Sequence, residues 1–171
     1  MQTRDQFQEN DEIAPASANL TTVHVSVLFR ETLEYLRPEP GKIFFDGTLG
    51  GGGHALALAR AVGETGLVVG VDRDAAALDR VDARVARTGE NLRVQTYFAN
   101  YCDFDAALER AGVERVDGFL LDLGLSSDQL ADRARGFSFN SDGDLDLRFD
   151  TTEGIPAYEA LNRWSAEKIA D

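Results

Sequence analysis

The sequence has a single cysteine, no long apolar run and few basic residues. Cys102 is the only cysteine among 171 residues, so no disulfide can form within the chain. The longest apolar runs, near residues 67–71 and 119–123, are far shorter than the roughly 20 residues that span a bilayer. The first 22 residues also lack the apolar core of a signal peptide. We therefore expect a soluble, cytoplasmic protein with no membrane partner.

Basic residues are too few for the whole chain to attract nucleic acid. Lys and Arg number 17 against 30 acidic residues, and the formal net charge is -13. This charge has the wrong sign for holding phosphates through overall electrostatics. Any contact with nucleic acid must therefore be local, and we interpret the negative charge as a contribution to solubility.

From residue 42 onward, short apolar runs alternate with helical patterns. Residues 1–22 are polar and without periodicity, which predicts a disordered tail, and order is predicted from about Val23, beginning with a helix that ends before Pro38. Strands are then predicted over 42–46, 67–72, 93–98 and 117–123, and helices over 55–62, around 78–85 and over 104–111. This alternation indicates right-handed βαβ crossovers and a parallel α/β sheet between helices. The fourth strand is apolar enough to predict burial on both faces.

After Leu123 the alternation stops. Helical pieces are predicted over 127–133 and 156–164, joined by the stretch GFSFNSDGDLDLRFD, and a further helix is predicted from Ser165. Four strands are fewer than doubly wound sheets usually have, so the ending is interpreted as a truncation.

A glycine-rich segment, DGTLGGGGH over residues 46–54, lies between the first strand and the following helix. Glycines let the backbone turn sharply and let a ligand approach closely, although such a loop can also be only a tight turn. Asp72 ends the next strand, where a carboxylate can accept both hydroxyls of an adenosine ribose. The loop and this acid together predict a cofactor site.

Asp46 distinguishes two classes of cofactor. An acid at the end of the first strand would repel the pyrophosphate of a dinucleotide, whereas the ammonium and sulfonium of S-adenosylmethionine (SAM) favour a nearby carboxylate. The segment also approximates the D-x-G-x-G-x-G pattern of SAM-dependent methyltransferases, with Gly50 and Gly52 in place and Thr48 replacing one glycine. SAM is therefore the predicted cofactor, and a dinucleotide-dependent oxidoreductase is the less favoured alternative.

Asp122 lies at the end of the fourth predicted strand. Because the carboxyl ends of parallel strands line one crevice, Asp46, Asp72 and Asp122 are predicted to converge there. The alternative is that each aspartate only caps the loop after it.

The order and spacing of several motifs resemble one family. HVSVLF, FDGTLGGGGH, VDRD, LLDLGLSSDQL and RGFSFNSDGDLDLRFD, from about His24 to Asp171, are similar to the small-subunit ribosomal RNA methyltransferase H family. The resemblance implies a Rossmann-like class I SAM-dependent methyltransferase fold. Residues 23–124 would form its first four parallel strands and SAM-binding half, and residues 125–171 the start of an inserted helical domain for substrate recognition. It also implies methylation of the exocyclic amine of a cytosine in small-subunit (16S) ribosomal RNA, with this RNA or the ribosomal subunit as partner.

The family's SAM-binding positions can be carried over residue by residue. They fall on Gly52, Gly53, His54, Asp72, Tyr101, Asp122 and Gln129. Family members usually have Phe where Tyr101 stands, and either ring can stack on adenine.

No metal site is predicted. Asp142, Asp144, Asp146, Asp150 and Glu153 have the spacing of a calcium loop, but position six of such a loop needs glycine and this chain has leucine there.

The catalytic prediction is restricted to one residue. The Asp/Asn-Pro-Pro-aromatic motif that many amino methyltransferases have after the fourth strand is replaced here by Asp122-Leu-Gly-Leu. Asp122 is therefore the hypothetical acceptor for the substrate amine. The alternative is that the shortened chain is a non-catalytic remnant that binds SAM or a protein.

Overall fold

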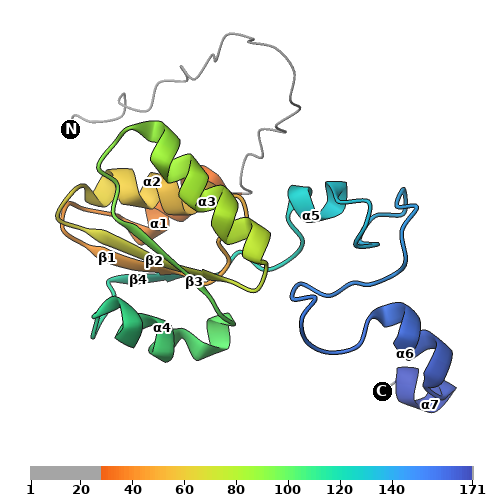
Figure 1. The fold of residues 1–171 in the computed structure, drawn as a ribbon. Helices are drawn as coiled ribbons and strands as arrows, with labels where there is room; N and C mark the ends of the chain where they lie inside the picture. Colours follow the sequence, from red (N-terminus) through yellow and green to blue (C-terminus); the bar gives the residue numbers. More distant parts are fainter. Residues whose placement is uncertain (1–27, 171) are drawn as a thin grey trace, which may run out of the picture.

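The computed structural model describes residues 28–170, so the predictions for the tail and for the start of order near Val23 lie outside the described residues. The structure has the predicted alternation of strands and helices (Figure 1). The strands are β1 (Ile43–Asp46), β2 (Leu67–Asp72), β3 (Val94–Phe98) and β4 (Gly118–Leu120). The helices are α1 (Phe29–Leu36), α2 (Gly53–Val62), α3 (Ala75–Thr88), α4 (Phe104–Ala111), α5 (Ser127–Ala131), α6 (Ala157–Arg163) and α7 (Ala166–Ala170), with a short 3₁₀ turn, η1 (Tyr101–Asp103), before α4.

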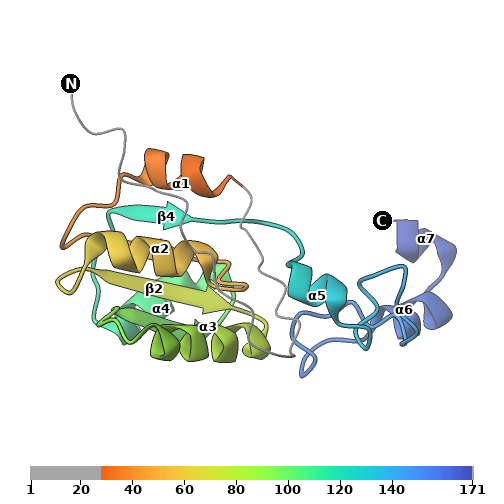
Figure 2. The same cartoon turned by 90° about the horizontal axis from the view of Figure 1, so that it is seen from above.

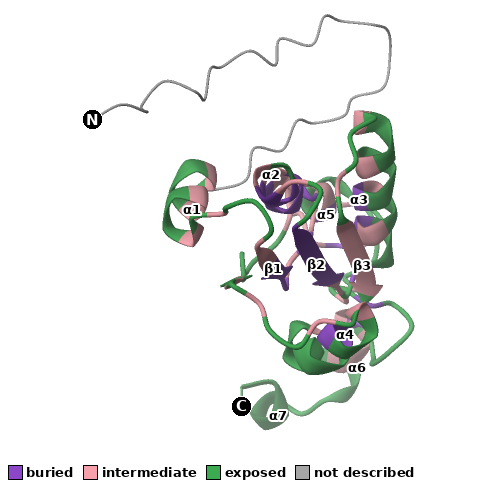
Figure 3. Ribbon diagram, turned by 90° about the vertical axis from the view of Figure 1, so that its left-hand side faces the viewer, coloured by how far each residue is buried: buried purple, intermediate pink, exposed green. Residues whose placement is uncertain are grey.

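All strand pairs in the sheet are parallel, in the order β3-β2-β1-β4. On one face, Phe44 of β1 packs in a cluster with Leu58 of α2 and Val81 of α3, and α1 contributes partly buried leucines. On the other face, Phe45 packs in a cluster with Leu108 of α4. Alternate residues of one strand therefore serve opposite layers, as a strand covered on both faces requires (Figure 3). The predicted α/β fold is confirmed.

The prediction for the fourth strand was wrong in length and in burial. Only Gly118–Leu120 pair with β1, and no strand of the described chain lies beyond β4. At this edge of the sheet Phe119 is 41% exposed, although its ring stacks on Phe45 with 4.4 Å between centroids. Before the strand, Asp117 is held at Ile43 twice: its carboxylate accepts a hydrogen bond from the Ile43 amide at 2.9 Å, and its own amide donates one to the Ile43 carbonyl at 2.7 Å. β4 therefore has one open edge, and its three residues are less buried than those of β2.

Local signals explain where individual helices begin and end. Asp74 is the N-cap of α3, and its carboxylate accepts a hydrogen bond from the Ala76 amide at 3.1 Å. Gly112, in the left-handed conformation at φ 69°, ends α4 as predicted. α2 begins at Gly53, two residues before the predicted start, directly from the glycine loop.

The chain after β4 lies beyond the carboxyl ends of the strands, with α6 and α7 farthest from the sheet (Figures 1 and 2). The helices α5, α6 and α7 correspond to the three pieces predicted there, and α5 is two residues shorter than predicted. That residues 125–171 form part of a separate substrate-recognition domain stays a prediction. Among residues 28–170, no helix is both long and apolar enough to cross a membrane.

Candidate functional site

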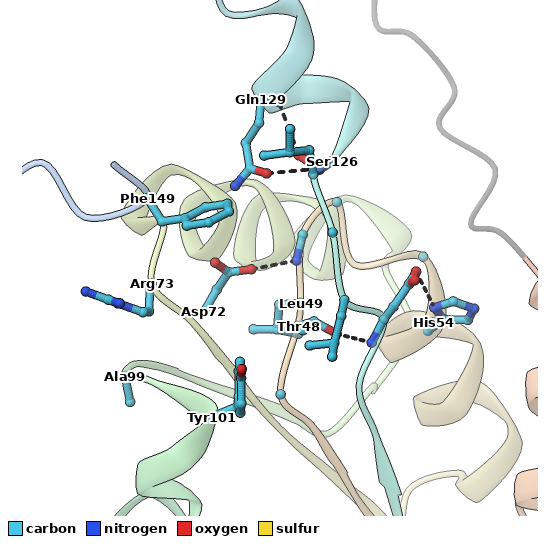
Figure 4. Close-up of a pocket in the computed structure, with 18 residues that line it drawn as sticks. Thr48, Leu49, His54, Asp72, Arg73, Ala99, Tyr101, Ser126, Gln129 and Phe149 are labelled. Atoms are coloured by element: carbon cyan, nitrogen blue, oxygen red, sulfur yellow. Dashed lines mark hydrogen bonds and ion pairs between the residues drawn. The ribbon is translucent and has the colours of Figure 1, made fainter. Parts of the chain in front are cut away.

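A cavity of about 580 Å³ lies at the carboxyl ends of β1 and β2 (Figure 4). This volume is typical of small-molecule sites, which measure about 300–1,000 Å³. Its walls include these residues predicted from the sequence: Gly50, Gly53, His54, Asp72, Tyr101, Asp122 and Gln129. The structure therefore brings the predicted site residues together, except for Asp46 and Gly52, which do not line the cavity.

Asp72 connects the glycine loop to the end of β2. One carboxylate oxygen, Oδ2, accepts a hydrogen bond from the Gly50 amide at 2.8 Å, and Oδ1 accepts one from the Asp74 amide at 2.9 Å. Burial raises the pKa of Asp72, although the hydrogen bonds from Gly50 and Asp74 act in the opposite direction. Asp72 thus sets the turn of the loop while its carboxylate faces the cavity (Figure 4).

Asp46 lies beneath the loop, with 1% of its surface exposed. Its Oδ1 accepts a hydrogen bond from the Thr48 amide at 3.0 Å. The pKa of Asp46 is raised to about 7, mainly by burial and to a smaller extent by the charges of Asp72 and Asp122, while the hydrogen bonds from Thr48 act in the opposite direction. Asp46 is therefore a buried acid under the cavity floor, and its predicted role in holding a ligand stays a prediction.

Two other loop residues explain the close packing of the site. A Cβ on Gly47 would lie 2.4 Å from Cδ2 of Leu121 and 2.8 Å from Cβ of Tyr101, so no side chain fits there. Gly52 has φ +75°, and its Cβ would lie 2.7 Å from Val81 of α3. Gly52 therefore allows the loop to pack against α3 and does not form a wall of the cavity.

Thr48, which replaces a glycine of the methyltransferase pattern, has a visible structural role. Its hydroxyl oxygen accepts a hydrogen bond from the Asp122 amide at 2.7 Å (Figure 4). This bond joins the loop after β1 to the segment after β4, 74 residues later. In the sequence Thr48 is only a departure from the methyltransferase pattern, so this structural role was not predicted.

Asp122 and His54 lie at the same side of the cavity. Nδ1 of buried His54 is 3.9 Å from Oδ2 of Asp122, which is beyond hydrogen-bond distance but within ion-pair distance if the imidazole is protonated. The His54 ring also stacks on Phe29 of α1, with centroids 5.6 Å apart. The Asp122 side chain is 44% exposed, so its carboxylate is accessible to a bound molecule.

Gln129 is held by a capping box at the start of α5. Its Oε1 accepts a hydrogen bond from the Ser126 amide at 2.9 Å, and the Ser126 hydroxyl accepts one from the Gln129 amide at 3.1 Å. Nε2 of Gln129 is 3.5 Å from Oδ2 of Asp74. The start of α5 was predicted correctly, and the spacing S-x-x-Q in the sequence is a signal that could also have identified the capping role of Ser126.

Aromatic rings approach the cavity from two distant parts of the chain. Tyr101 follows β3, and Phe149 comes from the long segment after α5 (Figure 4). Phe149 was not predicted as a site residue, because it belongs to no periodic element and no local pattern connects it to the glycine loop. Arg73 and Ala99 are further wall residues that the sequence analysis missed.

The charges on the walls fit SAM better than a dinucleotide. Asp72 and Asp122 contribute two carboxylates, whereas Arg73 is the only Lys or Arg that residues 28–170 place on the walls. The guanidinium of Arg73 points away from Asp72 (Figure 4). Carboxylates attract the ammonium and sulfonium of SAM and repel a pyrophosphate, so the residues present fit this cofactor.

The chain is similar to known methyltransferases over nearly all of its length. The model of the MraW methylase family matches residues 21–171. Ribosomal RNA small subunit methyltransferase H of Syntrophotalea carbinolica is 47% identical over 147 residues, which are 86% of this chain and 46% of that protein. The protein of the same name from Thermomicrobium roseum is 45% identical over 152 residues, covering 89% of this chain and 46% of that protein. The chain thus spans about half the length of the curated relatives it matches.

Among solved structures, PH0851 is similar to this chain in fold. The match covers 67% of this chain and 23% of that one, with 23% identity and a TM-score of 0.50.

Proposed function

The chain belongs to the MraW methylase family, and on that premise we propose that it acts as a SAM-dependent methyltransferase on small-subunit ribosomal RNA. The Rossmann-like class I fold and the cofactor SAM, both predicted from the sequence, are confirmed by this membership. The proposed substrate follows from the relatives named ribosomal RNA small subunit methyltransferase H. With this substrate, the cytoplasm is the proposed location.

The single observation that carries the proposal is the placement of Asp72. Its carboxylate lines the cavity while accepting the amide of Gly50, so the glycine loop and the acid form one preorganised unit. An ionised carboxylate has lone pairs for about four hydrogen bonds, so capacity remains for two ribose hydroxyls. We propose that Asp72 binds the ribose, that Tyr101 stacks on the adenine, and that the loop through Gly53 and His54 accommodates the methionine end.

When bound, SAM supplies an activated methyl group on a positively charged sulfur. The contribution of the chain is to hold the two reactants in line and to exclude competing orientations. Asp122 is the proposed acceptor for a hydrogen bond from the substrate amine, since its carboxylate is accessible and its backbone is held by Thr48. The resemblance described above supports a finer proposal, that this amine belongs to a cytosine. Such a base must be unpaired or flipped to enter the cavity.

The first test is a calorimetric titration of the purified chain with SAM. We expect micromolar binding by the wild type and its loss in Asp72→Asn, which removes the charge and one of the two acceptor oxygens. Asp79→Asn is the matched control, because Asp79 is exposed on α3 and makes none of the site's hydrogen bonds. A folded wild-type chain that gives no heat with SAM would contradict the proposal.

The second test follows transfer of a labelled methyl group from SAM to small-subunit ribosomal RNA, with the modified nucleotide located afterwards. Label on a cytosine amine would support the finer proposal, and label on another base would refute it. SAM binding without transfer would favour the alternative, a SAM-binding protein without catalysis. Thermal stabilisation by NAD but not by SAM would instead favour an oxidoreductase.

A further inference from the structure

The motif RGFSFNSDGDLDLRFD, residues 135–150, folds into a loop whose two ends are joined by one side chain. Nη2 of Arg135 donates hydrogen bonds to the carbonyl oxygens of Arg148 and Phe149, each at 2.6 Å. The Arg135 carbonyl in turn accepts a hydrogen bond from the Leu147 amide at 3.1 Å. The backbone position of Phe149 is therefore set by Arg135, fourteen residues earlier.

The same guanidinium attaches this loop to the sheet domain. Nη1 of Arg135 donates to Oδ2 of Asp74 at 2.9 Å, and only 14% of the Arg135 side chain and 6% of the Asp74 side chain are exposed. Oδ1 of Asp74 meanwhile caps α3 through the Ala76 amide. Because the pair is nearly buried, replacing Arg135 would leave the Asp74 carboxylate buried with one fewer positively charged partner. Asp74, to which Arg135 binds, is two residues from Asp72 in the sequence.

These contacts carry the Phe149 ring to the cavity wall. Phe149 lies near Arg73 and faces the same space as Asp72 (Figure 4). Phe149 and Arg73 also line a second hollow of about 350 Å³, so the ring stands between the two cavities. Phe137 supports the ring from within the motif, with centroids 5.6 Å apart, and the Arg135 guanidinium lies 5.3 Å from the Phe137 ring centroid.

We propose that Arg135 is a positioning residue that holds Phe149 as a wall of the SAM site at its adenosine end. The adenosine end follows from the neighbouring Asp72, the proposed ribose acceptor, so the inference rests on the proposed function. Phe149 contacts the cofactor, and Arg135 acts through it. The motif after α5 thereby completes the cofactor cavity of the sheet domain.

The test is a double-mutant cycle on SAM affinity with Arg135→Gln, Phe149→Leu and the double variant. Each single variant is expected to bind SAM roughly tenfold more weakly, the factor that the loss of one well-placed aromatic contact produces. If Arg135 acts by positioning Phe149, the double variant binds about as well as the weaker single variant, because the second change removes nothing more.

Matched controls come from the same motif and its flank. Arg133→Gln removes a guanidinium that is 69% exposed and binds Asn140 and Asp142 at the surface. Phe139→Leu removes a fully exposed ring. Both controls are expected to bind SAM as the wild type does.

Each outcome separates the inference from the function on which it rests. Additive losses in the double variant would show that Arg135 does not act through Phe149 and would overturn the inference. If a thermal melt shows that Arg135→Gln does not fold, the test depends on Phe149→Leu, which leaves no buried charge without a partner. Unchanged SAM affinity in Phe149→Leu would then overturn the inference. Absence of binding by the wild type would overturn the proposed function and the inference together, whereas wild-type affinity in both single variants overturns the inference only.

Discussion

Replacing Asp46 by asparagine removes a buried charge while keeping the shape of the side chain. The carboxylate lies 1% exposed under the glycine loop, and its Oδ1 accepts the Thr48 amide, which an asparagine oxygen can also do. Burial is the main cause of the raised pKa of Asp46, and the negative charges of Asp72 and Asp122 raise this pKa by smaller amounts. The variant therefore isolates the effect of one charge on the free energy of unfolding.

The direction of the pH dependence follows from the raised pKa. With a pKa of about 7 in the folded chain and an ordinary value of 3.8, the folded state binds the proton more tightly than the unfolded state. The stabilisation from Asp46 is complete below about pH 4 and is lost as the pH rises through about 7. At about 1.4 kcal/mol for each pH unit, the rise from 3.8 to about 7 corresponds to about 4 kcal/mol.

The assay is urea denaturation of the wild type and Asp46→Asn at several pH values between 4 and 8. The stability of the variant relative to the wild type should increase by about 4 kcal/mol across this range, since all other groups titrate in both chains. Asp79→Asn, at an exposed position of α3, is expected to show no such trend. A difference between Asp46→Asn and the wild type that does not change with pH would refute the assignment of a protonated Asp46 below neutral pH.

Two further predictions concern the same loop. Gly47→Ala places a methyl group 2.8 Å from Cβ of Tyr101. We therefore expect the free energy of unfolding to fall by roughly 1–3 kcal/mol in urea denaturation and SAM binding to weaken in calorimetry. Unchanged values in both measurements would refute the predicted clash. Thr48→Val removes the hydroxyl that accepts the Asp122 amide and should lower the unfolding free energy by about 1 kcal/mol, whereas Thr48→Ser should restore it.

The sequence was most informative where short segments carry their own pattern. Apolar runs of four to six residues matched β1 and β2 closely, because strands buried on both faces are apolar throughout. Asp72 and Asp122 were predicted to meet because parallel strands end at one edge of the sheet, and both line the cavity, although Asp122 lies two residues beyond the end of β4. Gly112, predicted to end the helix over 104–111, acts within a few residues of itself.

The structure corrected the sequence where a property depends on distant neighbours. The run predicted as the fourth strand, 117–123, is apolar like the other strands, but only Gly118–Leu120 pair with β1 at the sheet edge, and Phe119 is 41% exposed. Asp46 ends its strand as predicted, yet the loop that folds over it decides that it is buried and does not line the cavity.

The sequence by itself determined the alternating α/β fold, the glycine loop and the acids at the strand ends, because hydrophobic periodicity and turn chemistry are local. Only the tertiary structure decided which side chains close the cavity. Arg135 meets Asp74 across 61 residues and brings Phe149 with it, and no periodicity connects positions so far apart. Contacts of this kind depend on how a long segment returns over the sheet, which is set by packing and by the satisfaction of buried charge.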